Sequence, residues 1–91
     1  MDTKDKIQMM EKMGRELDDI LNSQTSLLKK ISQLEAENMN LGNKVLENRL
    51  PDIHSKVDDG ISEIKLVMDE FTEVKDKFIA DNPVEETPAG T

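Results

Sequence analysis

The sequence predicts an all-α protein built on a coiled coil, and three observations support that prediction. Apolar residues recur at alternating spacings of three and four over residues 10–48, and a helix breaker at Pro51 coincides with a change of register. The 91-residue chain also has no Trp, no Tyr and only two Phe, so a single helix has little with which to build a core. A stripe that repeats every 3.5 residues keeps one direction only when helices wind around each other.

The first expected element is a long heptad helix of about residues 7–48, within an oligomerisation segment of residues 1–50. In heptad notation (positions a to g), Leu occupies most d positions and Asn38 stands at an a position. A single polar Asn at a typically fixes the register and the number of strands in parallel dimers. We therefore expect a homodimer, with a predicted oligomer interface of Met10, Met13, Leu17, Ile20, Gln24, Leu27, Ile31, Leu34, Asn38, Leu41 and Val45.

The segment from Leu34 to Val45 resembles the middle of a leucine zipper, with Asn38 at a and Leu41 at d. The resemblance covers about twelve residues and implies pairing between helices. Acidic residues offset the basic residues upstream, so the chain has no basic region that could enter a DNA groove.

The second expected element is a shorter helix of about residues 52–80, in a segment of residues 51–80. Pro51 lacks a backbone N–H and disfavours helical geometry in the residue before it, so we expect the first helix to end there. Two arrangements remain open, an antiparallel hairpin and an extended rod kinked at Pro51. The hairpin is slightly favoured because pairing residue n with residue 100 − n would place Phe78 near Leu21 and Phe71 near Leu28, two apolar e positions that need cover.

The end of the chain, residues 81–91, is expected to be a disordered tail. It contains two of the three Pro residues and one Gly, and it has no apolar periodicity.

Charge is distributed unevenly along the chain. The net charge is −8, and residues 51–91 hold eleven acidic and four basic side chains. This excess disfavours direct binding to nucleic acid or to an anionic membrane and favours a basic protein partner. The candidate partner-binding surface consists of Asp58, Asp59, Glu63, Asp69, Glu70, Glu73 and Asp76.

The residue types predict neither catalysis nor a cofactor. The chain has no Cys, and its single histidine, His54, has no neighbouring ligands at a recognised metal-binding spacing. No apolar run reaches the roughly 18 residues of a membrane span, and the N-terminus lacks the apolar core of a signal peptide. We expect a location in the cytoplasm or in a virus particle, neither secreted nor membrane-spanning.

These features together predict a non-enzymatic assembly protein, a small scaffold or adaptor that presents an acidic helix to a protein partner. Its small size and simplicity would suit a phage or viral protein. The alternative is an acidic inhibitor that imitates DNA and occupies the basic nucleic-acid-binding surface of a host protein.

Overall fold

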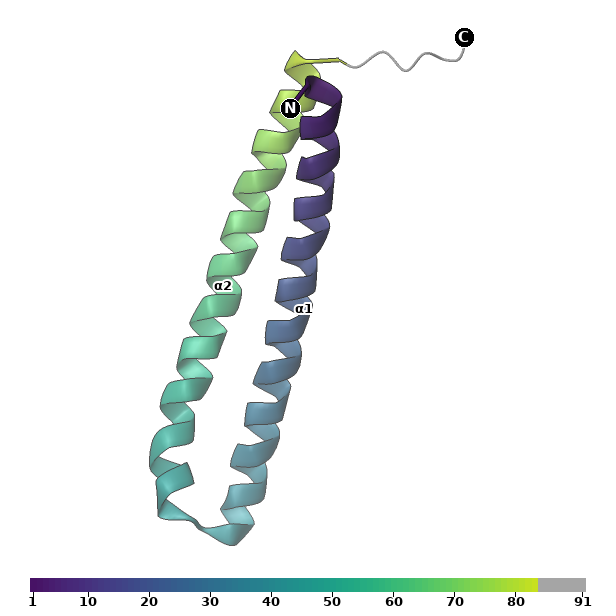
Figure 1. Cartoon of the computed structure of the whole chain (residues 1–91). Coiled ribbons are helices and arrows are strands. Elements are labelled where there is room, and N and C mark those ends of the chain that lie inside the picture. Colours follow the sequence, from purple (N-terminus) through teal and green to yellow (C-terminus); the bar gives the residue numbers. More distant parts are fainter. Residues whose placement is uncertain (84–91) are drawn as a thin grey trace.

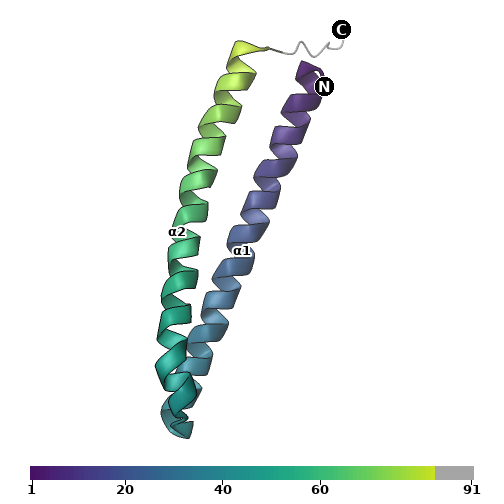
Figure 2. The same cartoon turned by 60° about the vertical axis from the view of Figure 1, so that its left-hand side comes forward.

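The computed structural model describes residues 1–83 and folds them into two long antiparallel helices, α1 (Thr3–Leu41) and α2 (Lys44–Asp81) (Figure 1). The molecule measures 68 × 21 × 17 Å along its principal axes. Two views show the helices side by side, with the start of α1 beside the end of α2 (Figures 1 and 2). The all-α prediction is confirmed, and the arrangement is the hairpin rather than the rod. Asp81 still belongs to α2, and the predicted tail from residue 84 onward lies outside the described residues.

The helices are separated at Gly42 and Asn43, so the prediction of a break at Pro51 is wrong. Gly42 has φ 71°, in the left-handed region that glycine enters without steric cost, and its N–H donates to the carbonyl of Asn38 at 2.7 Å. Asn43 then caps α2, because its Oδ1 accepts a hydrogen bond from the N–H of Leu46 at 3.1 Å. One two-residue turn thus ends α1 and begins α2.

Pro51 lies inside α2, which has 38 residues against 39 in α1 and is therefore almost as long. A proline there removes one backbone hydrogen bond and costs about 3 kcal/mol. The helix continues because the apolar residues before and after it face α1 along one stripe. Leu50 and Ile61 are only 7% and 8% exposed, and a break between them would open this stripe to water.

The early turn changes which residues face each other across the hairpin. The Nζ of Lys6 lies 5.9 Å from the centre of the Phe78 ring, and Gln24 lies against Gly60. Residue n therefore faces about residue 84 − n, and the predicted pairing with residue 100 − n is wrong. Phe78 lies near the start of α1 rather than near Leu21.

The core of this hairpin is a single thin seam. Residues at 3.5-residue spacing on each helix turn toward the other, but within residues 1–83 only three apolar side chains are less than 9% exposed. They are Ile31 at 5%, Leu50 at 7% and Ile61 at 8%. Two helices alone supply one layer, which leaves the outer sides of the apolar stripes uncovered.

Candidate functional site

The structure divides the predicted oligomer interface into two faces of α1. Its a positions turn toward α2 and are buried or half-buried: Met10, Leu17, Gln24, Ile31 and Asn38. Its d positions are exposed, with exposed fractions of 44% for Met13 and Ile20, 46% for Leu27 and Leu34, and 73% for Leu41. Val45, the last predicted member, lies at the start of α2 and is 66% exposed.

The a positions of α1 pack against α2 of the same chain because the e positions are also part of the buried stripe. Ile7, Gly14, Leu21 and Leu28 are half-buried beside the a column. A stripe of a and e faces about 80° away from the d column, so α2 covers one and leaves the other bare. The sequence showed that Leu21 and Leu28 needed cover, but it did not show that this cover would divide the seam.

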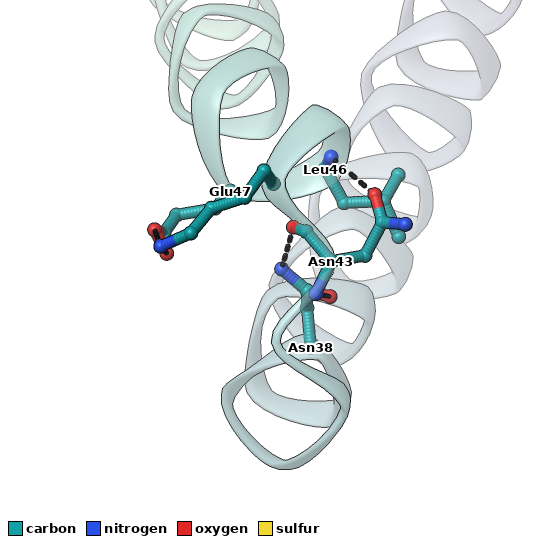
Figure 3. A network of polar contacts seen from close by, with 5 residues as sticks. Asn38, Asn43, Leu46 and Glu47 are labelled. Carbon is teal, nitrogen blue, oxygen red and sulfur yellow. Dashed lines mark hydrogen bonds and ion pairs between the residues drawn. The ribbon is translucent and has the colours of Figure 1, made fainter.

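Asn38 is buried, and its amide bonds within its own chain (Figure 3). Its Nδ2 donates to the carbonyl of Asn43 at 3.0 Å, and its Oδ1 accepts from the N–H of Asn43 at 2.9 Å. Both sides of the amide therefore hold the turn between α1 and α2. The structure gives Asn38 this partner in place of a second Asn38 across a dimer.

Gln24 is the other polar residue in the seam, and its situation is the opposite. Its Oε1 is buried without a hydrogen-bond partner, while its Nε2 lies 3.4 Å from the point where a side chain on Gly60 would begin. A buried acceptor left unpaired costs about 1–3 kcal/mol. Gln24 thus weakens the seam at its middle.

α2 carries an exposed apolar column of its own. Ile53, Val67 and Val74 are 45%, 45% and 55% exposed, and Gly60 occupies the missing step of this seven-residue spacing. From sequence these residues belonged to one broad apolar stripe with the residues that now face α1. The regular seven-residue spacing was the available sign that they form a separate column.

The exposed columns of the two helices lie on the same side of the hairpin. Met13 and Ile20 line one groove together with Val67 and Phe71. The opposite groove is lined largely by polar and charged side chains, including Glu11, Asp18, Thr72 and Lys75. The hairpin therefore has a polar edge and an apolar edge. We define the apolar edge as Met13, Ile20, Leu27 and Leu34 of α1 with Ile53, Val67 and Val74 of α2.

The seven predicted partner-binding acids are all exposed on α2, but they do not converge on one site. Glu63 and Glu70 border the apolar edge, and the other five lie around the outer surface of the helix. Among residues 1–83 the ion pairs are Lys12–Glu16 at 3.9 Å and Lys44–Glu47 at 3.1 Å, each within one helix. The described part of α2 thus presents these acids to solvent as a spread acidic surface.

No metal centre or membrane span emerges from the described residues. Within residues 1–83, no three His, Asp or Glu side chains are grouped as a metal site would require, and His54 is half-buried on α2. Neither α1 nor α2 combines the length and apolar character needed to cross a membrane.

Comparison of the chain with protein-family models, with curated proteins and with solved structures found no match. The functional conclusion therefore rests on the geometry of this chain, and above all on its two contrasting edges.

Proposed function

We propose that this protein is a non-enzymatic assembly protein that self-associates through its apolar edge and presents the acidic outer surface of α2 to a protein partner. The observation that supports this most strongly is the row of α1 d-position side chains. Four of them, spaced by seven residues, are 44–46% exposed on the same side as the apolar column of α2.

The physical reason is the imbalance between the two sides of the seam. Burial of apolar surface stabilises a structure by about 25 cal/mol per Å², and long contiguous apolar patches are rare on monomers. Within residues 1–83 this hairpin buries only three apolar side chains almost completely and half-buries twelve others, while the seven of the apolar edge stay 44–55% exposed. A second copy provides an apolar edge of the same length and shape, and two hairpins would close into a four-helix bundle with a two-layered core.

Sedimentation analysis of the full chain at micromolar concentration tests self-association. We expect a dimer for the natural sequence and a monomer for Leu27→Asp, because the new carboxylate would be buried in the apolar interface. The matched control is Ser32→Asp, which should remain dimeric. Ser32 is exposed and lies two heptads after Asp18, in the same column of the polar edge. A monomeric natural sequence would contradict the proposal.

The adaptor role rests on the acids that point away from the apolar edge. Asp69, Glu73 and Asp76 are exposed on the outer side of α2, so a dimer leaves them free for a partner. Reversing all three to Lys should abolish binding to a basic partner while the dimer persists. Binding by the natural sequence should weaken as salt rises, because exposed charges are screened within about 8 Å at physiological ionic strength.

The second candidate function is inhibition of a nucleic-acid-binding protein, favoured by the exposure of all seven acids on α2. In this role the acidic surface would compete with DNA or RNA for a basic protein surface. A competition assay would separate the two functions. Displacement of DNA by the natural sequence but not by the triple Lys variant would favour the inhibitor, and binding without displacement would favour the adaptor.

A further inference from the structure

We propose that two hairpins pack through their apolar edges about a two-fold axis perpendicular to their long axis. α1 would then lie antiparallel on α1 of the second copy, and α2 on α2. This inference rests on the self-association proposed above and specifies its geometry. The competing two-fold arrangement has its axis along the hairpin and places α1 on α2 of the second copy. The charges that border the apolar edge distinguish the two.

On α1 the bordering column is formed by the exposed g positions, and its charges complement each other around a single centre. Glu16 lines the apolar groove beside Ile20, and Ser23 and Lys30 lie on either side of Leu27. When α1 packs antiparallel on itself with its centre at Ser23, Glu16 meets Lys30 of the second copy. At the ends of the column, Met9 lies against Glu37 of the second copy. Only one member of this pair is charged, so it adds neither attraction nor repulsion between charges.

The apolar residues of α1 fit the same centre. With Ser23 beside Ser23 of the second copy, Ile20 lies against Leu27 and Met13 against Leu34. All four d positions of the apolar edge are therefore covered, and none is left opposite a charge. Antiparallel packing of this kind pairs g positions with g positions, where charges select orientation.

On α2 the column bordering the apolar edge independently gives the same result. Its exposed members are Arg49, Lys56, Glu63, Glu70 and Lys77, at seven-residue spacing. Antiparallel packing of α2 on itself brings Arg49 to Glu70 and Lys56 to Glu63, so these two basic residues meet acids. Lys77, the third basic residue of the column, would lie beside the turn at Gly42 of the second copy and meet no charge. Glu63 and Glu70, two of the predicted partner-binding acids, would then belong to the dimer interface instead.

The centre on α2 falls at Gly60. Around it, Ile53 lies against Val67 of the second copy, while Gly60 meets Gly60, where the absence of a side chain permits close approach of the backbones. Within one hairpin Gly60 lies directly against Gln24, the neighbour of Ser23. The charge patterns of two separate helices therefore place the two-fold axis at one level of the hairpin.

The competing arrangement is disfavoured because it brings like charges together beside the apolar edge. With the axis along the hairpin, α1 faces α2 of the second copy in about the same register as within the chain. Glu16 would then face Glu70, and Lys30 would face Lys56, against a single attractive pair of Glu37 with Arg49. Like charges at such positions oppose pairing and act against the wrong orientation.

The intrachain contact of Glu16 does not remove it from this interface. Its carboxylate lies 3.9 Å from Lys12, and both side chains are about 60% exposed. An ionised carboxylate accepts several hydrogen bonds, so a second cation can approach.

The chain lacks Cys, so single cysteine variants test the geometry directly. Ser23→Cys places one thiol on the proposed axis, and mild oxidation of the full-length variant should yield a disulfide-linked dimer on a non-reducing gel. Ser32→Cys, on the polar edge, is the matched control and should stay unlinked. Sedimentation of each variant in reducing buffer confirms that the dimer itself is intact.

A mixture of Lys30→Cys and Lys56→Cys chains tests the competing arrangement, which alone would link the two different chains. A dimeric protein in which Ser23→Cys stays unlinked while this mixture crosslinks would overturn the proposed axis and leave self-association standing. A monomer in reducing buffer would instead overturn both.

Charge exchange gives a second, independent readout. Glu16→Lys and Lys30→Glu should each raise the dimer Kd about tenfold, since a two-fold dimer contains each pair twice. The double variant should restore the Kd, because the pair is only exchanged. The competing arrangement predicts the reverse for Glu16→Lys, which would there relieve repulsion from Glu70 and tighten the dimer.

Discussion

At the scale of single residues, Asn38 and Gln24 show how one sequence signal can have opposite consequences. Both are polar residues at a positions, and both were expected to lie in a seam. Asn38 satisfies its amide on the backbone of Asn43, whereas the Oε1 of Gln24 stays buried and unpaired. The sequence could not separate them, because the partner of Asn38 is created by a turn whose position was not predicted.

Replacing Asn38 should destabilise the protein. Asn38→Leu would remove both hydrogen bonds to Asn43 and leave the backbone N–H of Asn43 without a partner, at a cost of about 1–3 kcal/mol, while the carbonyl of Asn43 keeps the N–H of Glu47. Chemical denaturation measures this change. A gain in stability would contradict the structure, because it is the result expected for an Asn that pairs across a parallel dimer.

Replacing Gln24 should change the unfolding free energy in the opposite direction. Gln24→Met keeps the length of the side chain and removes the unpaired buried oxygen, so we expect a gain of about 1 kcal/mol in unfolding free energy. Gln8→Met, on an exposed position of α1, is the control and should change stability little. Equal effects at both positions would show that general apolar character is responsible.

At the scale of elements, the helices and their amphipathic stripes followed from periodicity, but their boundaries did not. Pro51 predicts a helix boundary that the structure places at Gly42 and Asn43 instead. Those two residues form a stop and a start signal together, because glycine ends α1 in the left-handed region and Asn43 caps α2. Pro51 costs one hydrogen bond, and this local penalty is smaller than the penalty of exposing the apolar residues on either side of it.

Substitution by alanine should change stability in opposite directions at two glycines, one inside α1 and one in the turn that follows it. Gly42→Ala should destabilise by about 1–2 kcal/mol, because its φ of 71° is unfavourable for a residue with a side chain. Gly14→Ala should stabilise by up to about 1 kcal/mol, since Gly14 is helical and nothing lies within 4 Å of the added carbon. Thermal unfolding compares the two, and a loss at Gly14 would reveal close packing there by another molecule.

At the scale of the whole molecule, the hairpin could be predicted from the sequence. Which apolar faces pack within the chain and which stay exposed could not. Leu21 and Leu28 showed that a second layer had to cover α1. Which apolar column of α1 is covered by α2 depends on the position of the turn. The turn comes about eight residues earlier in the sequence than predicted, and this changes every residue pair across the hairpin. The acids of α2 were predicted as one surface, yet Glu63 and Glu70 border the apolar edge whereas Asp69 and Asp76 lie on the outside.

Self-association should make stability depend on concentration. A dimer that unfolds to separate chains has a Tm that rises with protein concentration, by mass action. We expect a steady increase in Tm for the natural sequence between about 1 and 100 µM by circular dichroism, and none for Leu27→Asp. A concentration-independent Tm for both the natural sequence and Leu27→Asp would mean that the thin core of one hairpin is enough to keep a single chain folded.

The hairpin brings the start of α1 and the end of α2 to the same end of the molecule (Figures 1 and 2). A group attached at Met1 would therefore leave from this end, which we call the pole of the hairpin. A two-fold axis perpendicular to the hairpin places the second copy's pole at the far end of the bundle. The dimer would then act as a bipolar spacer, holding two identical attachments roughly one helix length apart and facing in opposite directions.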